Sequence, residues 1–303
     1  DHLGAVDSIC FGSESNDLES LQEIAGILLE EPDGYQELLK EALRSGQSYP
    51  SARQKALAGC TGNDALASLL DDPNNILGIE YLKALRKLNS SMVPYTILRQ
   101  GAHYHDKTLS GQYSSASAIR SLLAYSSSSL RADRSGGTFE DMPFSSVLGE
   151  LEEQVPACCL ELLRDYHKVQ YPVYQNDFSL ILKYKLLNKQ PEDLTRYMDV
   201  SEELANRICS QLNNFFNYKQ FCDLLKTREI THSRVNRALL HIMLGIKEKD
   251  VQEYIENGRH FYARLLGFRK DRSKLLSLFS EQSSIPVLTR LSESSSISAL
   301  GQQ

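Results

Sequence analysis

The chain has 303 residues, of which 41% are hydrophobic and 24% are charged. This length allows two domains, and the composition is ordinary for a globular protein. The net charge of −6 excludes nucleic-acid binding through bulk charge alone. There is no apolar run of about 18 residues and no secretory leader, so we expect a cytoplasmic protein that does not enter membranes. No protein partner is implied.

The first hundred residues alternate between strand-like and helix-like patterns. Strands are expected at 8–11 and 93–98, and helices at 18–28, 35–43, 65–70 and 75–88. This order predicts a parallel α/β sheet. Serine-rich sequence then runs from Thr108 to Ser135, interrupted by a helix at 118–124. After this segment the sequence shows only helical patterns, and helices are expected to start near Asp177, Ser201 and Thr231. We therefore expect an α/β domain over residues 1–140 and an α-helical domain over residues 141–303.

Two asparagines open the helix expected after Pro73. Asn74 and Asn75 are good helix N-caps at this position. The same geometry suits a nucleotide, because a helix N-terminus offers free N–H groups and a positive dipole. Local sequence leaves both interpretations open.

A second pair of polar residues, Ser114 and Ser115, leads into the helix that carries Arg120. Serines before a helix are ordinary caps. Hydroxyls, helix N–H groups and a guanidinium are also what a phosphate site requires. Both interpretations remain open here too.

Two residues follow the expected strands. Gly12 ends the first strand, where it makes a turn or admits a ligand close to the backbone. Arg99 follows the second strand, and open α/β sheets bind ligands at that end. His103 and His105 are two positions apart, so on an extended segment their side chains would face the same way, as a pair of metal ligands requires. No third ligand has suitable spacing, so no metal site is expected.

Basic residues concentrate in two segments of the helical half, 219–237 and 259–274. Arg234, Arg237 and His241 share one helix face, opposite an apolar stripe. Such a face is either solvated or a surface for nucleic-acid phosphates.

Together these pieces resemble the tRNA(Met) cytidine acetate ligases, within the nucleotidyltransferases named for a His-x-Gly-His signature. The matching motifs, in order, are Phe11–Glu14, Pro73–Leu85, Arg99 with His103–Asp106, Ser114–Arg120, Thr227–Arg237 and Tyr262–Phe268. The resemblance covers nearly all of the chain, and residues 74–81 are its most specific part.

The resemblance implies a partial Rossmann-like, ATP-binding domain over residues 1–140 and a tRNA-binding domain over 141–303. It also implies that ATP, with Mg²⁺, activates acetate as acetyl-adenylate, and that the acetyl group passes to N4 of the wobble cytidine of elongator tRNA(Met). The implied ATP contacts are Gly12, Asn74 and Arg99. The implied phosphate contacts are Asn75, Ser114, Ser115 and Arg120. The implied tRNA contacts are Lys226, Arg228, Arg234, Arg237 and Arg264.

The family's first signature, a His-x-Gly-His loop after the first strand, does not occur in this chain. We therefore expect that the chain lacks an N-terminal part of the catalytic domain and is inactive as it stands. Two other functions remain open. One is a nucleotidyltransferase that acts on a small phosphorylated metabolite, and the other is a non-catalytic RNA-binding module.

Overall fold

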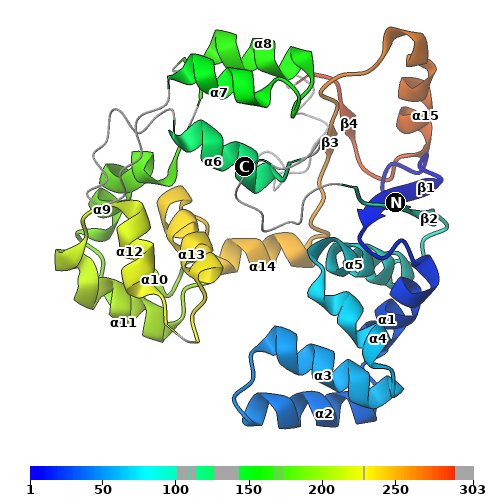
Figure 1. Cartoon of the computed structure of the whole chain (residues 1–303), viewed down its shortest axis with the longest axis horizontal. Helices are drawn as coiled ribbons and strands as arrows, with labels where there is room; N and C mark the ends of the chain where they lie inside the picture. The colour runs from blue at the N-terminus through cyan, green and yellow to red at the C-terminus, as the bar shows by residue number, and fades with distance from the viewer. Residues whose placement is uncertain are drawn as a thin grey trace. The chain divides into compact units, whose positions relative to one another are not determined.

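The computed structural model describes residues 1–100, 109, 114–125, 143–167, 169–171, 173–227 and 229–290. The chain forms two compact units (Figure 1). Unit 1 comprises Asp1–Leu160 and Phe268–Ser284, and unit 2 comprises Glu161–Gly267 and the segment from Ile285. The described residues are mostly helical, with two small parallel sheets. The division of functions between residues 1–140 and 141–303 stays a prediction.

Unit 1 contains the strand pair expected from the sequence. Its elements are β1 (Ser8–Ser13), α1 (Leu18–Glu30), α2 (Asp33–Arg44), α3 (Tyr49–Thr61), α4 (Asp64–Ser68), η1 (Leu69–Asp71), α5 (Pro73–Lys87), β2 (Val93–Leu98), α6 (Ala116–Tyr125), α7 (Phe144–Leu151), η5 (Lys270–Arg272) and α15 (Lys274–Gln282). Helix α8 (Ala157–Tyr166) crosses the division between the units.

Strands β1 and β2 pair in parallel, from Ser8 opposite Val93 to Ser13 opposite Leu98. Parallel pairing requires a crossover, and the helices between the strands supply it. Both strands and their parallel order are confirmed. Side chains alternate along each strand, so Phe11 is buried while Tyr95 and Ile97 are exposed. One face of this sheet is thus covered, and the other carries exposed apolar side chains.

Gly78 brings α5 close to the sheet. It is buried in the helix, and a Cβ at this position would collide with the Phe11 ring. Helix α5 also packs along α1, and Ile79 and Leu82 are buried in the same core. The close approach sets the position of the first turn of α5 beside the end of β1.

Helix α3 was not expected from the sequence. Its buried residues are only Ala52, Ala56 and Leu57, so the apolar stripe is weak. The helix forms because small residues let it pack closely on α2: a Cβ at Gly59 would lie 2.7 Å from Leu38 Cδ1. Tertiary packing, not periodicity, stabilises it.

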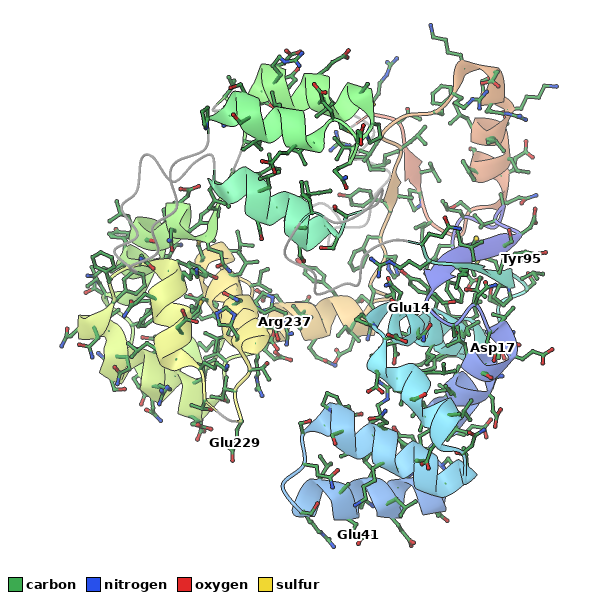
Figure 2. The ribbon with its side chains drawn as sticks, viewed as in Figure 1. Glu14, Asp17, Glu41, Tyr95, Glu229 and Arg237 are labelled. Carbon is green, nitrogen blue, oxygen red and sulfur yellow. The ribbon has the colours of Figure 1, made fainter. Side chains whose placement is uncertain are left out.

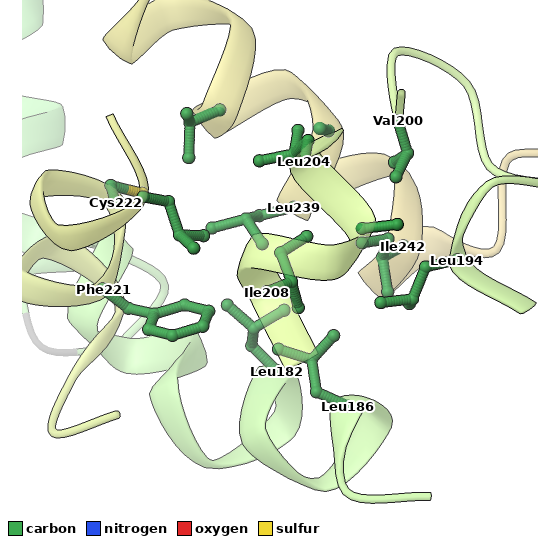
Figure 3. Packing of buried hydrophobic residues seen from close by; sticks show 14 of the residues in the cluster. Leu182, Leu186, Leu194, Val200, Leu204, Ile208, Phe221, Cys222, Leu239 and Ile242 are labelled. Atoms are coloured by element: carbon green, nitrogen blue, oxygen red, sulfur yellow. The ribbon is translucent and has the colours of Figure 1, made fainter. Parts of the chain in front are cut away.

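Unit 2 is built around one apolar core (Figure 3). Its elements are η3 (Gln175–Phe178), α9 (Ser179–Leu186), α10 (Pro191–Leu194), α11 (Glu202–Gln211), η4 (Leu212–Asn214), α12 (Tyr218–Leu225), α13 (His232–Leu244), α14 (Glu248–Glu256), β3 (Ala263–Arg264) and β4 (Val287–Leu288). The expected caps at Ser201 and Thr231 are confirmed, since each hydroxyl accepts a backbone N–H bond from three residues later. In the part of the chain that the structure describes, no helix is long and apolar enough to cross a membrane.

Candidate functional site

Glu14 joins three segments that are far apart in the sequence. Its carboxylate accepts hydrogen bonds from Asn74 Nδ2 at 2.6 Å and from the Asn75 N–H at 3.0 Å. Arg99 Nη1 lies 3.5 Å from the same carboxylate. Figure 2 shows Glu14 beside α5. One side chain therefore holds the loop after β1, the first turn of α5 and the residue after β2.

Asn75 is fully buried and ties the same loop from the other side. Its Oδ1 accepts the N–H groups of Glu14 at 3.0 Å and Ser15 at 3.1 Å. Of the two interpretations left open for Asn74 and Asn75, the one that makes them helix caps is wrong. Asp72 is the N-cap residue and Pro73 the first helical residue, so both asparagines lie inside the first turn. Their amides are used for tertiary contacts rather than for capping.

The charge of Glu14 is stabilised where it lies. Burial by itself would raise the pKa of this carboxyl, but the hydrogen bond from the Asn74 side chain and the backbone N–H bonds outweigh it and lower the pKa below 4.5. The N-terminal end of α5 also favours an anion. The local chemistry therefore suits negative charge beside the first turn of α5.

Gly12, Ser13 and Arg99 complete this end of the sheet. Gly12 is exposed and pairs with Ile97, and no described atom lies within 4 Å of where a Cβ would stand on it. The Arg99 N–H donates to the Ser13 carbonyl at 2.9 Å, which continues the strand pairing. The structure thus brings Gly12, Asn74, Asn75 and Arg99 to the carboxyl ends of the two parallel strands, where α/β sheets bind ligands.

Glu14 itself was not among the residues expected at the site. The signal that could have found it is its place in Phe11–Glu14, the motif that ends the first strand. An acidic residue there gave no reason to expect three converging donors, because those donors come from residues 60 to 85 positions away.

The structure places the serine pair at the start of α6. Ser115 is buried, and its Oγ accepts the Ala118 N–H at 3.0 Å, which is the capping interaction. The Ser114 N–H donates to Gln154 Oε1 at 3.1 Å. Arg120 is exposed, with Nη2 3.4 Å from Ser117 Oγ. Capping is thus confirmed for Ser115, and the phosphate role of these residues stays a prediction.

In unit 2, Arg237 makes a two-bond ion pair with Asp199. Nε and Nη2 each lie 3.0 Å from one carboxylate oxygen, and His241 Nδ1 lies 3.4 Å from the same group. The hydrogen bond from Arg237 lowers the pKa of Asp199, and the hydrogen bond to Asp199 raises the pKa of Arg237. Arg237 therefore links α13 to the turn before α11, while its side chain stays 57% exposed.

Of the other basic residues expected to bind RNA, Lys226, Arg234 and Arg264 are exposed. Arg228 lies outside the described residues, as do His103 and His105. Within the described ranges, no three His, Cys, Asp or Glu side chains form a metal-binding group.

Comparison with known proteins decides the family. Residues 1–302 match the family described as HIGH Nucleotidyl Transferase. The tRNA(Met) cytidine acetate ligase of Acetivibrio thermocellus is 36% identical over 96% of this chain and 67% of its own length. That of Caldanaerobacter subterraneus subsp. tengcongensis is 37% identical over 97% of this chain and 67% of its own length. The chain belongs to the tRNA(Met) cytidine acetate ligase family. The resemblance read from its motifs is confirmed.

Solved members of the family share the fold. TmcAL of Thermotoga maritima, in its apo form, superposes with a TM-score of 0.81 at 30% identity over 96% of this chain. The same protein bound with alpha-thio ATP superposes with a TM-score of 0.78 at 29% identity over the same share. This chain spans 65% and 64% of those two chains and about two thirds of the curated relatives.

Proposed function

We propose that this chain is part of an ATP-dependent ligase that acetylates elongator tRNA(Met). The carboxylate of acetate attacks the α-phosphate of ATP, which releases pyrophosphate and leaves acetyl-adenylate. N4 of the wobble cytidine then takes the acetyl group, and AMP leaves. The names of the relatives support this substrate set, and the solved TmcAL of Thermotoga maritima that carries alpha-thio ATP supports the nucleotide.

The observation that carries the proposal is the group of residues that meet Glu14 at the carboxyl ends of β1 and β2, namely Asn74, Asn75 and Arg99. Asn74 and Arg99 contact ATP, and exposed Gly12 lets the nucleotide approach the strand end. Glu14 is a positioning residue, because it holds Asn74 Nδ2 at 2.6 Å and lies 3.5 Å from Arg99. Preset donors avoid the entropy cost of ordering them when ATP binds.

The phosphates are assigned to Ser114, Ser115 and Arg120 at the start of α6. Asn75, also expected to contact them, acts instead as a positioning residue, because its N–H donates to Glu14 and its buried side chain holds the loop after β1. Mg²⁺ accompanies ATP and is held mainly by the phosphates, as is usual for this ion. Glu14 is not proposed as its ligand, since its carboxylate already meets Asn74, Asn75 and Arg99.

Unit 1 is proposed to be part of a Rossmann-like catalytic domain. Its two parallel strands leave apolar side chains exposed on one face, including Tyr95 and Ile97. The family's His-x-Gly-His loop does not occur in these 303 residues. We expect the chain alone to be inactive and to need such a loop for turnover.

The tRNA is assigned to the helical half of the chain. Lys226, Arg228, Arg234, Arg237 and Arg264 contact its phosphates and so set affinity and register. The support is their clustering in a chain whose net charge is −6. Arg237 serves both its ion pair and a phosphate, because more than half of its side chain is exposed.

The test follows transfer of radiolabelled acetate to an elongator tRNA(Met) transcript under saturating ATP. Two samples are compared: the chain alone, and the chain joined to a family segment that bears the histidine loop. Transfer is expected only in the second sample. Absence of transfer in both would overturn the ligase proposal, whereas transfer by the chain alone would overturn the requirement for the loop.

A further inference from the structure

One surface of unit 2 exposes large apolar side chains that the proposed function does not use. Leu180 and Tyr184 lie one turn apart on α9, and Leu187 follows at its C-cap. Phe216 lies in the segment before α12. Leu180 is 83%, Tyr184 76% and Phe216 75% exposed, which is unusual for side chains of this size. These four residues are called the Tyr184 surface.

The exposure follows from the orientation of α9. Leu182 and Leu186 are buried in the core, where Figure 3 shows them near Phe221. Residues at 180, 184 and 187 follow i, i+4, i+7 spacing, so they share a different face of the same helix. The apolar character of that face is therefore not explained by the core of unit 2.

Phe216 belongs to the same surface because its neighbours are bound to α9. Lys183 Nζ donates to the Phe215 carbonyl at 3.2 Å and lies 5.6 Å from the centre of the Phe215 ring. The Tyr218 N–H donates to Ser179 Oγ at 3.0 Å. Contacts on both sides of Phe216 thus hold its backbone beside Ser179 and Lys183 of α9.

The charge around the surface is positive. Lys183, Lys185 and Lys189 come from the α9 segment, and Lys219 follows Phe216. There is no Asp or Glu from 178 to 191 or from 204 to 222. Four acids border these segments: Asp177, Glu192, Glu203 and Asp223. Two of them have partners, since Asp177 Oδ2 accepts the Tyr174 N–H at 2.8 Å and Asp223 Oδ1 lies 3.2 Å from His232 Nε2.

The combination of exposed aromatic rings and lysines distinguishes between two kinds of partner. Protein interfaces are enriched in aromatic residues but depleted in lysine. Surfaces that bind single-stranded nucleic acid combine aromatic rings, on which bases stack, with lysines and arginines that follow the phosphates. Asn188 follows Leu187 and is exposed, so its amide can hydrogen-bond a base edge.

We infer that the Tyr184 surface binds unpaired bases of RNA, with Tyr184 and Phe216 stacking on the bases and Lys185 and Lys219 meeting the phosphates. The inference rests on the proposed tRNA substrate, whose wobble base lies in a loop and is available for stacking. It adds a base-contacting surface to the phosphate contacts assigned to Arg234 and Arg237.

The experiment measures binding of a labelled single-stranded RNA of about 12 nucleotides, within the site sizes of such surfaces. The same RNA annealed to its complement and an elongator tRNA(Met) transcript are measured in parallel. Tyr184→Ala and Phe216→Ala are each expected to weaken single-strand binding about tenfold, while duplex binding changes little. Tyr184→Phe keeps the ring and should bind like the wild type. Lys185→Gln should reduce the salt dependence by about 0.7 in log–log slope.

Tyr49→Ala is the matched control, since Tyr49 is an exposed tyrosine on α3 of unit 1. It should leave binding unchanged. Wild-type binding by the Tyr184→Ala/Phe216→Ala double variant, or no single-strand binding by the wild type, would overturn the inference. A change of oligomeric state in the double variant with unchanged RNA binding would instead identify a protein contact and overturn it too.

The outcomes also separate this inference from the ligase proposal. Weakened RNA binding in the variants without any acetyl transfer would leave the surface in place and remove the ligase. Acetyl transfer by the loop-bearing protein, together with unchanged RNA binding by the variants, would support the ligase and overturn the RNA-binding role of the Tyr184 surface.

Discussion

Glu14 and Asn75 each accept a hydrogen bond from the other's backbone, although they lie 61 residues apart. The Glu14 N–H donates to Asn75 Oδ1, and the Asn75 N–H donates to Glu14 Oε2, each at 3.0 Å. The pair joins the loop after β1 to the first turn of α5. Asn74 and Arg99 converge on the same carboxylate, so the candidate nucleotide site depends on this link.

Asn75→Ala should destabilise the loop after β1. It removes the acceptor of two backbone N–H groups, those of Glu14 and Ser15, in a buried position. The expected loss is about 2 kcal/mol of unfolding free energy, with faster hydrogen exchange over residues 14–16. Urea unfolding and exchange mass spectrometry provide the measurements.

Asn74→Ala is the comparison for that variant. Asn74 is half-buried and donates one bond, to Glu14, so the expected stability loss is smaller, about 1 kcal/mol. In a form of the protein that binds ATP, affinity should fall, because the amide is proposed to contact the nucleotide. Normal ATP affinity would reduce Asn74 to a structural residue.

Gly78→Ala should destabilise unit 1, although alanine is the better helix former. The new Cβ would collide with the Phe11 ring and push α5 from β1. Overpacking of this kind costs about 1–3 kcal/mol. Gly149→Ala in α7 is the control, since no described atom lies within 4 Å of its Cβ position, and it should be neutral or stabilising. Equal stability of the two variants would contradict the close packing seen here.

Asp199→Asn should make the stability of unit 2 depend less on pH in the acid range. The pKa of Asp199 is lowered below 3.8, mainly by the hydrogen bond from Arg237. The contribution of Asp199 to the free energy of unfolding is therefore present above pH 3.8 and is lost as the pH falls through the lowered pKa. Asparagine is the suitable replacement because Asp199 has φ +67°, a conformation that Asn tolerates. Thermal unfolding of both proteins from about pH 2 to 6 would check this. An unchanged dependence of stability on acid pH would show that other carboxylates determine it.

Arg234→Gln should weaken tRNA binding without lowering stability. Arg234 is an exposed residue in the first turn of α13, and loss of one phosphate contact reduces the salt slope of binding by about 1. Arg237→Gln differs, because it also breaks the pair with Asp199 and should lower the unfolding free energy by less than about 1 kcal/mol. Salt-dependent tRNA titration with parallel unfolding curves distinguishes them. Unchanged binding by both variants would move the phosphate contacts elsewhere.

Local pattern predicted much of the fold. The strand at 93–98 follows from its residue composition. The start of α13 at Thr231 and its buried face of Val235, Ala238 and Leu239 follow from capping and helical spacing. These signals arise within a few residues of chain. Helix α3 was not predicted because its buried face is mostly alanine. Local sequence could not decide whether Asn74 caps the helix, and the structure shows that Asp72 is the N-cap residue.

The sequence by itself determined the family, the parallel strand pair and the residues Gly12, Asn74, Asn75 and Arg99 that meet at the strand ends. Only the tertiary structure identified Glu14 as the group that holds three of them, paired Arg237 with Asp199, and left Tyr184 and Phe216 exposed. The reason is physical. Periodicity and capping depend on neighbours along the chain, whereas the partner of a carboxylate and the cover over an apolar face depend on packing between distant segments.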